Sequence, residues 1–226
     1  MVIQDTRTRR GPLGALVAAK LISLIGSQLT LVALPWFVLV TTGSAAKTGL
    51  TGLAVTLPAV VVGLVGGALV DRLDYRQTSV IADLTSAAGI AAVPLLYHTR
   101  GIEFWQLLIL VFLGSLLTVP GLTARRAMLP ELADLAGMTL DRANSISESA
   151  SYVALLLGPP LAGVLIAFIG ASNVLWLDAA SFVVSAAIVA GSIPAASQAS
   201  ERTVSGRYLD DLKAGLRFVR DDRLLL

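Results

Sequence analysis

Residues 66–76 read Gly66-Gly67-Ala68-Leu69-Val70-Asp71-Arg72-Leu73-Asp74-Tyr75-Arg76. An apolar run that begins near Thr48 ends in this stretch, four charges fall within six positions, and a new apolar run begins near Ser79. Two segments of membrane-spanning length therefore meet at a very short charged turn. The glycines at the end of the first segment allow another helix to approach its backbone closely. The stretch thus predicts a hairpin of two transmembrane helices.

The composition supports a membrane protein throughout the chain. Of the 226 residues, 55% are hydrophobic and only 14% are charged, and the mean hydropathy is +0.79. Soluble domains carry about 25% charged residues. The basic residues are dispersed between apolar runs, which is typical of topology signals and argues against a nucleic-acid partner. The chain has no cysteine, one histidine and no Gly-Lys-Ser/Thr phosphate loop, so we expect no enzyme activity, no metal and no cofactor.

Apolar runs of about 20 residues predict six transmembrane helices, because this length spans a bilayer. The predicted spans are 13–40, 48–70, 80–97, 104–122, 149–169 and 174–193, and a polar loop is expected at 123–144. The domain prediction has three parts: a cytoplasmic N-terminus at 1–12, the bundle at 13–193, and a cytoplasmic linker at 194–226. The linker carries an amphipathic helical pattern and ends as another span would begin, so we expect a further C-terminal half.

The distribution of Lys and Arg predicts the orientation. With the N-terminus inside, the inner segments hold 14 of these residues and the outer loops hold only Lys47 and Arg100. Cytoplasmic loops are enriched in Lys and Arg, so both ends of the chain are expected in the cytoplasm and the bundle in the inner (plasma) membrane.

A weak internal repeat divides the six predicted spans. Gly67-Ala68-Leu69-Val70 in the second span is echoed by Gly163-Val164-Leu165-Ile166 in the fifth. The first copy is followed by an inner turn and the second by an outer turn. We therefore predict an all-α membrane protein whose six transmembrane helices form two inverted three-helix repeats, an arrangement common in transporters.

The charged turn resembles the signature loop of the major facilitator superfamily at Gly67, Asp71, Arg72 and Arg76. It departs from the pattern at Asp74 and Tyr75, where the family usually has Gly-Arg. The resemblance implies half of a twelve-helix fold. It also implies that this loop locks the two halves together and gates the inner side.

Gly158, Pro159 and Gly163 in the fifth span are similar to a motif of antiporter members. Proline bends a helix and glycine permits close packing, so an ordinary kink at a helix contact is at least as good an interpretation as a role in coupling. The segment 124–132 and the span-one segments 26–30 and 33–35 resemble the macrolide-efflux and enterobactin-exporter branch.

Polar residues inside the membrane are costly, and each is a functional candidate. Gln28 could contact substrate or make an interhelical hydrogen bond. Asp83 is expected in an ion pair with the basic loop, or with Arg125 and Arg126. Glu148 could join that cluster. Asp178 is the best candidate for binding a proton, because burial favours the neutral form of a carboxyl group. A structural role is favoured for Asp178, since span six is peripheral in the family.

The predicted function is secondary active transport by alternating access. The branch resemblance implies export of drug-like or siderophore-like amphipathic compounds by proton antiport. The expected partners are the lipid bilayer, the small-molecule substrate, protons and the missing C-terminal half. The alternatives are an uptake carrier or uniporter of the same fold, and a half-size membrane scaffold that does not transport.

Overall fold

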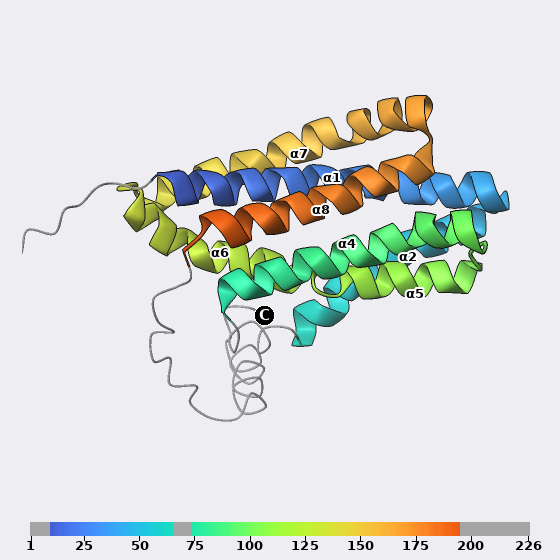
Figure 1. Cartoon of the computed structure of the whole chain (residues 1–226), viewed down its shortest axis with the longest axis horizontal. Coiled ribbons are helices and arrows are strands. Elements are labelled where there is room, and N and C mark those ends of the chain that lie inside the picture. Colours follow the sequence, from blue (N-terminus) through green and yellow to red (C-terminus); the bar gives the residue numbers. More distant parts are fainter. Residues whose placement is uncertain (1–9, 66–73, 195–226) are drawn as a thin grey trace, which may run out of the picture. The chain divides into compact units, whose positions relative to one another are not determined.

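The computed structural model describes residues 10–65 and 74–194, which form seven helices and no strand within those ranges (Figure 1). The helices are α1 (Gly11–Thr42), α2 (Ala45–Val65), α4 (Tyr75–Thr99), α5 (Phe104–Ser115), α6 (Thr118–Leu135), α7 (Leu140–Ile169) and α8 (Ala171–Ser192). In this part of the chain, five helical segments are long and apolar enough to cross a membrane. These are Gly11–Thr42, Tyr75–Thr99, Phe104–Leu135, Leu140–Ile169 and Ala171–Ser192. The chain is therefore an all-α, multi-pass membrane protein.

The segment 123–144, predicted to be a polar loop, is mostly helical. Helix α6 continues to Leu135 and α7 begins at Leu140, so only residues 136–139 separate the two helices. The loop prediction was wrong because it rested on charge content. Ala124, Met128 and Leu132 recur every four residues on α6, and all three side chains are buried. This spacing places them on one face of a helix, which holds the charged segment against the bundle.

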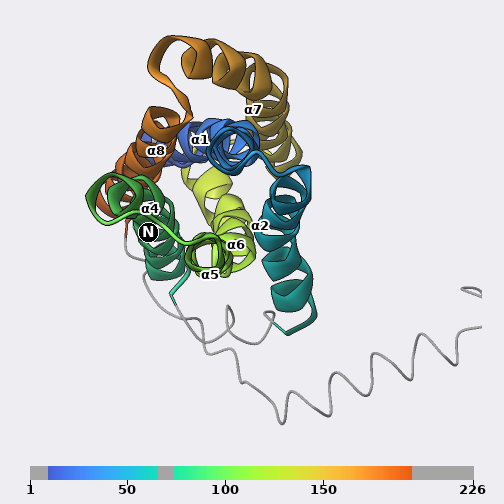
Figure 2. The same cartoon turned by 90° about the vertical axis from the view of Figure 1, so that its right-hand side faces the viewer.

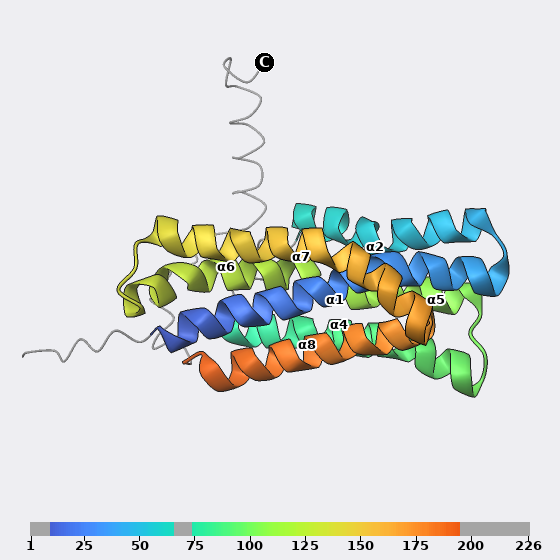
Figure 3. The same ribbon diagram turned by 90° about the horizontal axis from the view of Figure 1, so that it is seen from above.

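Helix α1 occupies the middle of the bundle. It packs between α7 and α8, and α8 packs in turn against α4 (Figure 3). Viewed along the bundle, α5 and α6 lie beside α4, and α2 lies on the far side of α5 from α4 (Figure 2). Helix α1 also contacts α2 and α6, so a buried polar residue on α1 can find its partner on any of four helices.

Two buried apolar clusters stabilise the two ends of the bundle. The α5 cluster includes Leu34, Phe37, Val93, Val111 and Leu175, and the α6 cluster includes Leu16, Met128, Leu129, Ala143 and Val189. On α1 the α6 cluster ends at Ala19 and the α5 cluster begins at Leu29. Lys20, Ser23, Ser27 and Gln28 of α1 lie between these two positions, so the apolar clusters enclose a polar layer inside the bundle.

Small residues set the distance between α4 and α5. A Cβ atom placed on Gly89 would lie 2.7 Å from the Gly114 Cα, closer than real side chains come to a backbone atom. The backbones of the two helices touch here, as at many contacts between membrane helices.

Candidate functional site

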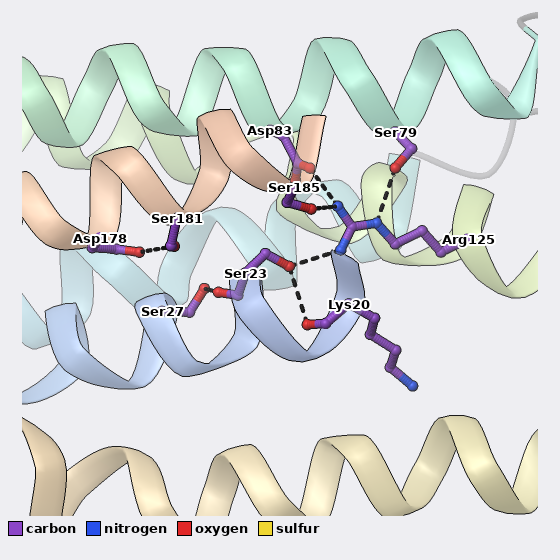
Figure 4. A network of polar contacts seen from close by, with 9 residues as sticks. All are labelled: Lys20, Ser23, Ser27, Ser79, Asp83, Arg125, Asp178, Ser181 and Ser185. Carbon is purple, nitrogen blue, oxygen red and sulfur yellow. Dashed lines mark hydrogen bonds and ion pairs between the residues drawn. The ribbon is translucent and has the colours of Figure 1, made fainter. Parts of the chain in front are cut away.

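Arg125 is the centre of the polar layer (Figure 4). The sequence places it on α6 at a position that faces the bundle, and only 4% of it is exposed. Its Nε donates to Ser79 Oγ at 2.9 Å, and its Nη1 donates to Ser23 Oγ at 2.7 Å. Its Nη2 donates to Asp83 Oδ2 and, at 2.8 Å, to Ser185 Oγ. One guanidinium group thus links α1, α4, α6 and α8.

The partners of Arg125 compensate for the burial of its charge. A charged group removed from water is tolerated when an opposite charge and hydrogen-bond partners replace the solvent. Asp83, itself 6% exposed, supplies the opposite charge, and three serine hydroxyls accept the remaining hydrogen bonds. The planar guanidinium group of arginine carries five N–H donors in a fixed geometry, which suits acceptors on several helices at once. We call Ser23, Ser79, Asp83, Arg125 and Ser185 the Arg125 network.

Lys20 links α1 to α7 in the same way. Its side chain is 5% exposed, and its Nζ donates to the backbone oxygen of Ser147 and to Ser147 Oγ, both at 2.9 Å. The Nζ also lies 3.3 Å from Glu148 Oε1, on a side chain that is about half exposed. Glu148 therefore pairs with Lys20 in this structure, and no contact with the Arg125 network is recorded for it.

A cavity of about 270 Å³ lies between α1, α6 and α7. It brings together Gln28, Arg125 and Glu148, three candidates that are far apart in the sequence. Arg126, which was expected only as a partner for Asp83, also lines the cavity. The full lining is Leu16, Lys20, Leu24, Gln28, Leu122, Arg125, Arg126, Leu129, Ser147, Glu148, Ser151, Ala154 and Leu155. Apolar walls with a few polar groups are typical of binding sites for small molecules.

Asp178 lies apart from this cavity, on the opposite side of α1. It is 1% exposed and accepts hydrogen bonds from Thr30 Oγ1 of α1 and, at 3.3 Å, from Ser181 Oγ. Gly26 of α1 faces the same point, and a Cβ atom there would collide with Asp178 and Ser181. The glycine thus allows α1 to approach the carboxyl group.

The three residues of the antiporter-like motif have different surroundings. A Cβ atom on Gly158 would collide with the Cβ of Gln28, so Gly158 allows α7 to pack on α1 beside the cavity. Gly163 is exposed, and a Cβ atom there would meet nothing within 4 Å. Pro159 lies inside α7, which continues through it. Of these three residues, only Gly158 is needed for close helix packing in the described part of the chain.

Most of the signature loop, including Gly67, Asp71 and Arg72, lies outside the described residues. Its last basic residue, Arg76, donates through Nη2 to the backbone oxygen of Ala190 and so joins the start of α4 to the end of α8. Asp74, the departure from the family pattern, caps α4: its carboxylate accepts from the backbone N–H groups of Arg76, at 2.7 Å, and Gln77. Aspartate is a preferred N-cap residue, which gives the extra acid a local structural reason.

The serines of the Arg125 network were missed by sequence reasoning. Single serines in apolar helices are common, and each one alone carries no signal. Their spacing, however, is a signal. On α1, intervals of four and three residues separate Ser23, Ser27 and Thr30, and on α8, intervals of three and four residues separate Asp178, Ser181 and Ser185. Such intervals place side chains on one face of a helix. Among the described residues no group of three His, Cys, Asp or Glu could hold a metal ion.

Comparison with known proteins gives consistent results. A family model described as transmembrane secretion effector, of the MFS type, matches residues 9–225. The multidrug efflux pump Tap of Mycolicibacterium fortuitum is 39% identical over 95% of this chain and 53% of its own length. The multidrug efflux pump Tap of Mycobacterium tuberculosis (strain ATCC 25618 / H37Rv) is 34% identical over 96% of this chain and 53% of its own length.

A more distant relative is macrolide efflux protein A of Streptococcus pyogenes, 26% identical over 76% of this chain and 42% of its own length. The chain spans about half the length of the curated relatives it matches. No solved structure matches it significantly. The family model covers almost the whole chain, and the matched relatives are transporters and efflux proteins. The chain therefore belongs to the transmembrane secretion effector family of the major facilitator superfamily.

Proposed function

We propose that this chain forms the N-terminal half of a secondary transporter that exports drug-like or siderophore-like amphipathic compounds. The observation that carries the proposal is the cavity between α1, α6 and α7, in which apolar walls are combined with Gln28, Lys20, Arg126 and Glu148. Relatives described as multidrug and macrolide efflux proteins support the direction of transport and the substrate class.

The lining of the cavity suits amphipathic compounds. Leu24 and Leu155 offer apolar surface, and each Å² of apolar surface removed from water contributes about 25 cal/mol to binding. Gln28 can donate or accept a hydrogen bond, which orients a substrate without requiring a charge. A site of this kind tolerates different molecules, because most of its binding energy is not directional.

Alternating access requires a second half that closes the cavity from the other side. In this proposal α2 completes a set of six transmembrane helices with the five long apolar segments, and the two groups of three helices are inverted repeats. The halves rock around the cavity and expose it to each side of the membrane in turn. An inward flow of protons supplies the driving force.

The proposed orientation, with both ends of the chain in the cytoplasm of a plasma-membrane protein, predicts a labelling pattern. Thr139, between α6 and α7, should be inside, and Ala46, at the start of α2, should be outside; both residues are exposed. The chain has no cysteine of its own, so single Thr139→Cys and Ala46→Cys variants give clean signals. An impermeant thiol reagent applied to intact cells should label only position 46. Labelling of position 139 before the cells are permeabilised would reverse the orientation.

Filling the cavity tests the export function. Ser151 lines the cavity on α7, and Val153 lies on the same helix, exposed and outside the lining. In the complete transporter, Ser151→Phe should weaken substrate binding by about 1–3 kcal/mol, which corresponds to roughly 5- to 150-fold in affinity, because the ring competes for the space. Val153→Phe adds the same ring without entering the cavity and is the matched control.

The measurement is efflux of a fluorescent drug-like dye from cells loaded with it, together with the membrane level of each variant. The proposal expects slow efflux for Ser151→Phe at a normal membrane level, and near-normal efflux for Val153→Phe. Equal efflux by the two variants would remove the cavity from the transport path. If cells with the unchanged transporter accumulated the dye, the protein would be an uptake carrier.

A further inference from the structure

A row of hydroxyl groups lines the contact between α1 and α8. On α1 it consists of Ser23, Ser27 and Thr30, and on α8 of Ser185, Ser181 and Asp178, and we call these six residues the α1–α8 polar row. On each helix the row extends over eight residues, about 10 Å along the axis. One end of the row is the Asp178 carboxyl group, and the other end reaches the Arg125 network (Figure 4).

Asp178 has no cation beside it. Its recorded partners are the hydroxyl groups of Thr30 and Ser181, and no ion pair with it is found among residues 10–65 and 74–194. On α1, which packs against α8, the charged group Lys20 is engaged by Ser147 and Glu148 of α7.

The other helices packed against α8 supply no cation to Asp178 either. On α4, Asp83 is bound to Arg125. The two basic side chains of α4 that touch α8 do so near its ends, Arg76 at Ala190 and His98 at Ser172. Charged residues of α7 are confined to its first third, at Asp141, Arg142 and Glu148. A carboxyl group that is 1% exposed and surrounded only by hydroxyl groups is far more stable when a proton neutralises it.

A small cavity adjoins the middle of the polar row. Its volume is about 30 Å³, and its polar lining consists of Ser23, Ser27, Asp83, Ser86, Thr118 and Arg125. A cavity of this size has room for one water molecule when two to four polar groups are available to bind it. Ser27 Oγ now donates to the Ser23 backbone oxygen at 2.9 Å, and a hydroxyl group can rotate toward a water molecule.

We propose that the α1–α8 polar row is a proton pathway, with Asp178 as the proton-binding site and Asp83 as the group at the other end. This inference rests on the proposed transport function and adds a site to it. On loading, a hydronium ion gives up a proton, an O–H bond forms at the Asp178 carboxylate, and a water molecule is left. On release, that bond breaks, and the proton passes along the hydroxyl oxygens of Ser181 and Ser27 and the water molecule, each of which accepts one proton and gives up another. The proton ends on a carboxylate oxygen of Asp83.

Arrival of the proton at Asp83 has a structural consequence. A neutral Asp83 no longer forms an ion pair with Arg125, and the link between α1, α4, α6 and α8 is weakened. Proton transfer along the row would in this way be coupled to the packing of four helices beside the substrate cavity, which Arg125 also lines.

Infrared spectroscopy tests the proton site without any need for transport. In the complete transporter in lipid vesicles at neutral pH, a carbonyl stretch of a protonated carboxyl group should be present, and Asp178→Asn should remove it. Asp141→Asn is the matched control, because Asp141 is exposed at the start of α7. An unchanged band in Asp178→Asn would overturn the proposal. So would the absence of such a band in the unchanged protein.

A transport assay tests the pathway. With an imposed pH gradient, Asp178→Asn should slow gradient-driven dye export by about a hundredfold, the usual contribution of a positioned proton-transfer group, while dye exchange without a gradient continues. Ser181→Ala, which keeps the carboxyl group, should slow gradient-driven export several-fold, and Ser149→Ala, an exposed hydroxyl on α7, should not.

The outcomes separate this inference from the proposed function. If the unchanged protein exchanges no dye, the export proposal fails, and the infrared result decides the proton site by itself. If dye is exchanged and Asp178→Asn still responds fully to the gradient, the transporter proposal stands and the pathway is refuted. If Asp178→Asn does not reach the membrane, Ser181→Ala gives the decision, and unchanged gradient-driven export by that variant would refute the pathway.

Discussion

Arg125→Met is expected to destabilise the folded chain by about 3–5 kcal/mol, because it leaves the Asp83 carboxylate buried without its counter-charge. Methionine keeps much of the volume of the arginine stem, so the loss of polar contacts rather than a cavity dominates the effect. The loss can be measured as the change in free energy of unfolding of the purified protein in detergent micelles, followed by tryptophan fluorescence.

The neighbouring residue provides the control. Arg126 is exposed, and no hydrogen bond or ion pair is recorded for it in the described part of the chain. Arg126→Met should therefore change the stability by less than about 0.5 kcal/mol. Combining Arg125→Met with Asp83→Leu removes the orphaned charge and should recover part of the loss. Equal stabilities of the two single methionine variants would contradict the role given to the network.

Gly158→Leu is expected to destabilise the protein by about 1–3 kcal/mol, because its Cβ would collide with the Gln28 Cβ and force α7 away from α1. The collision involves the Cβ atom of Gln28, which is fixed to the backbone, so a change of rotamer cannot relieve it. Thermal unfolding in detergent, with folding monitored by circular dichroism, measures the effect.

Gly163→Leu is the matched variant, five residues further along α7. Its Cβ meets nothing within 4 Å, and leucine is favoured over glycine in a helix by up to about 1 kcal/mol. The stability should therefore be unchanged or slightly higher. A loss at Gly163 as large as at Gly158 would mean that the outer face of α7 is covered by a part of the protein beyond residues 10–65 and 74–194.

The helices were predictable because a single property of the chain decides them. An apolar run near 20 residues must form a helix in a bilayer, where every backbone N–H and C=O group needs an internal partner. The predicted span 13–40 corresponds to α1 at Gly11–Thr42, and the predicted span 174–193 to α8 at Ala171–Ser192. The prediction was wrong at 123–144, where the charged residues were taken to indicate a loop. The apolar residues of α6 recur there every four positions, which is typical of a helix.

The candidate site was predictable only in part. An ion pair of Asp83 with the basic loop, or with Arg125 and Arg126, was expected from the sequence, because a charge is costly to bury alone. The partners of Lys20 were not predictable, since Ser147 is 127 residues away and one of its two acceptors is a backbone oxygen. Asp178 was recognised as a candidate, but its neighbours Thr30 and Gly26 depend on how α1 and α8 are rotated against each other.

By itself, the sequence of this protein determined the membrane-spanning helices and the residues that need polar partners, since both follow from the cost of exposing polar groups to hydrocarbon. Which partners these residues obtain was decided by the tertiary structure alone. Small residues such as Gly26 and Gly158 set how closely the helices approach, and the approach brings Ser23, Asp83 and Ser185 to a single guanidinium group. Hydrogen bonds fail beyond about 3.5 Å, so sub-ångström packing, which no local pattern encodes, turns scattered polar residues into a connected network.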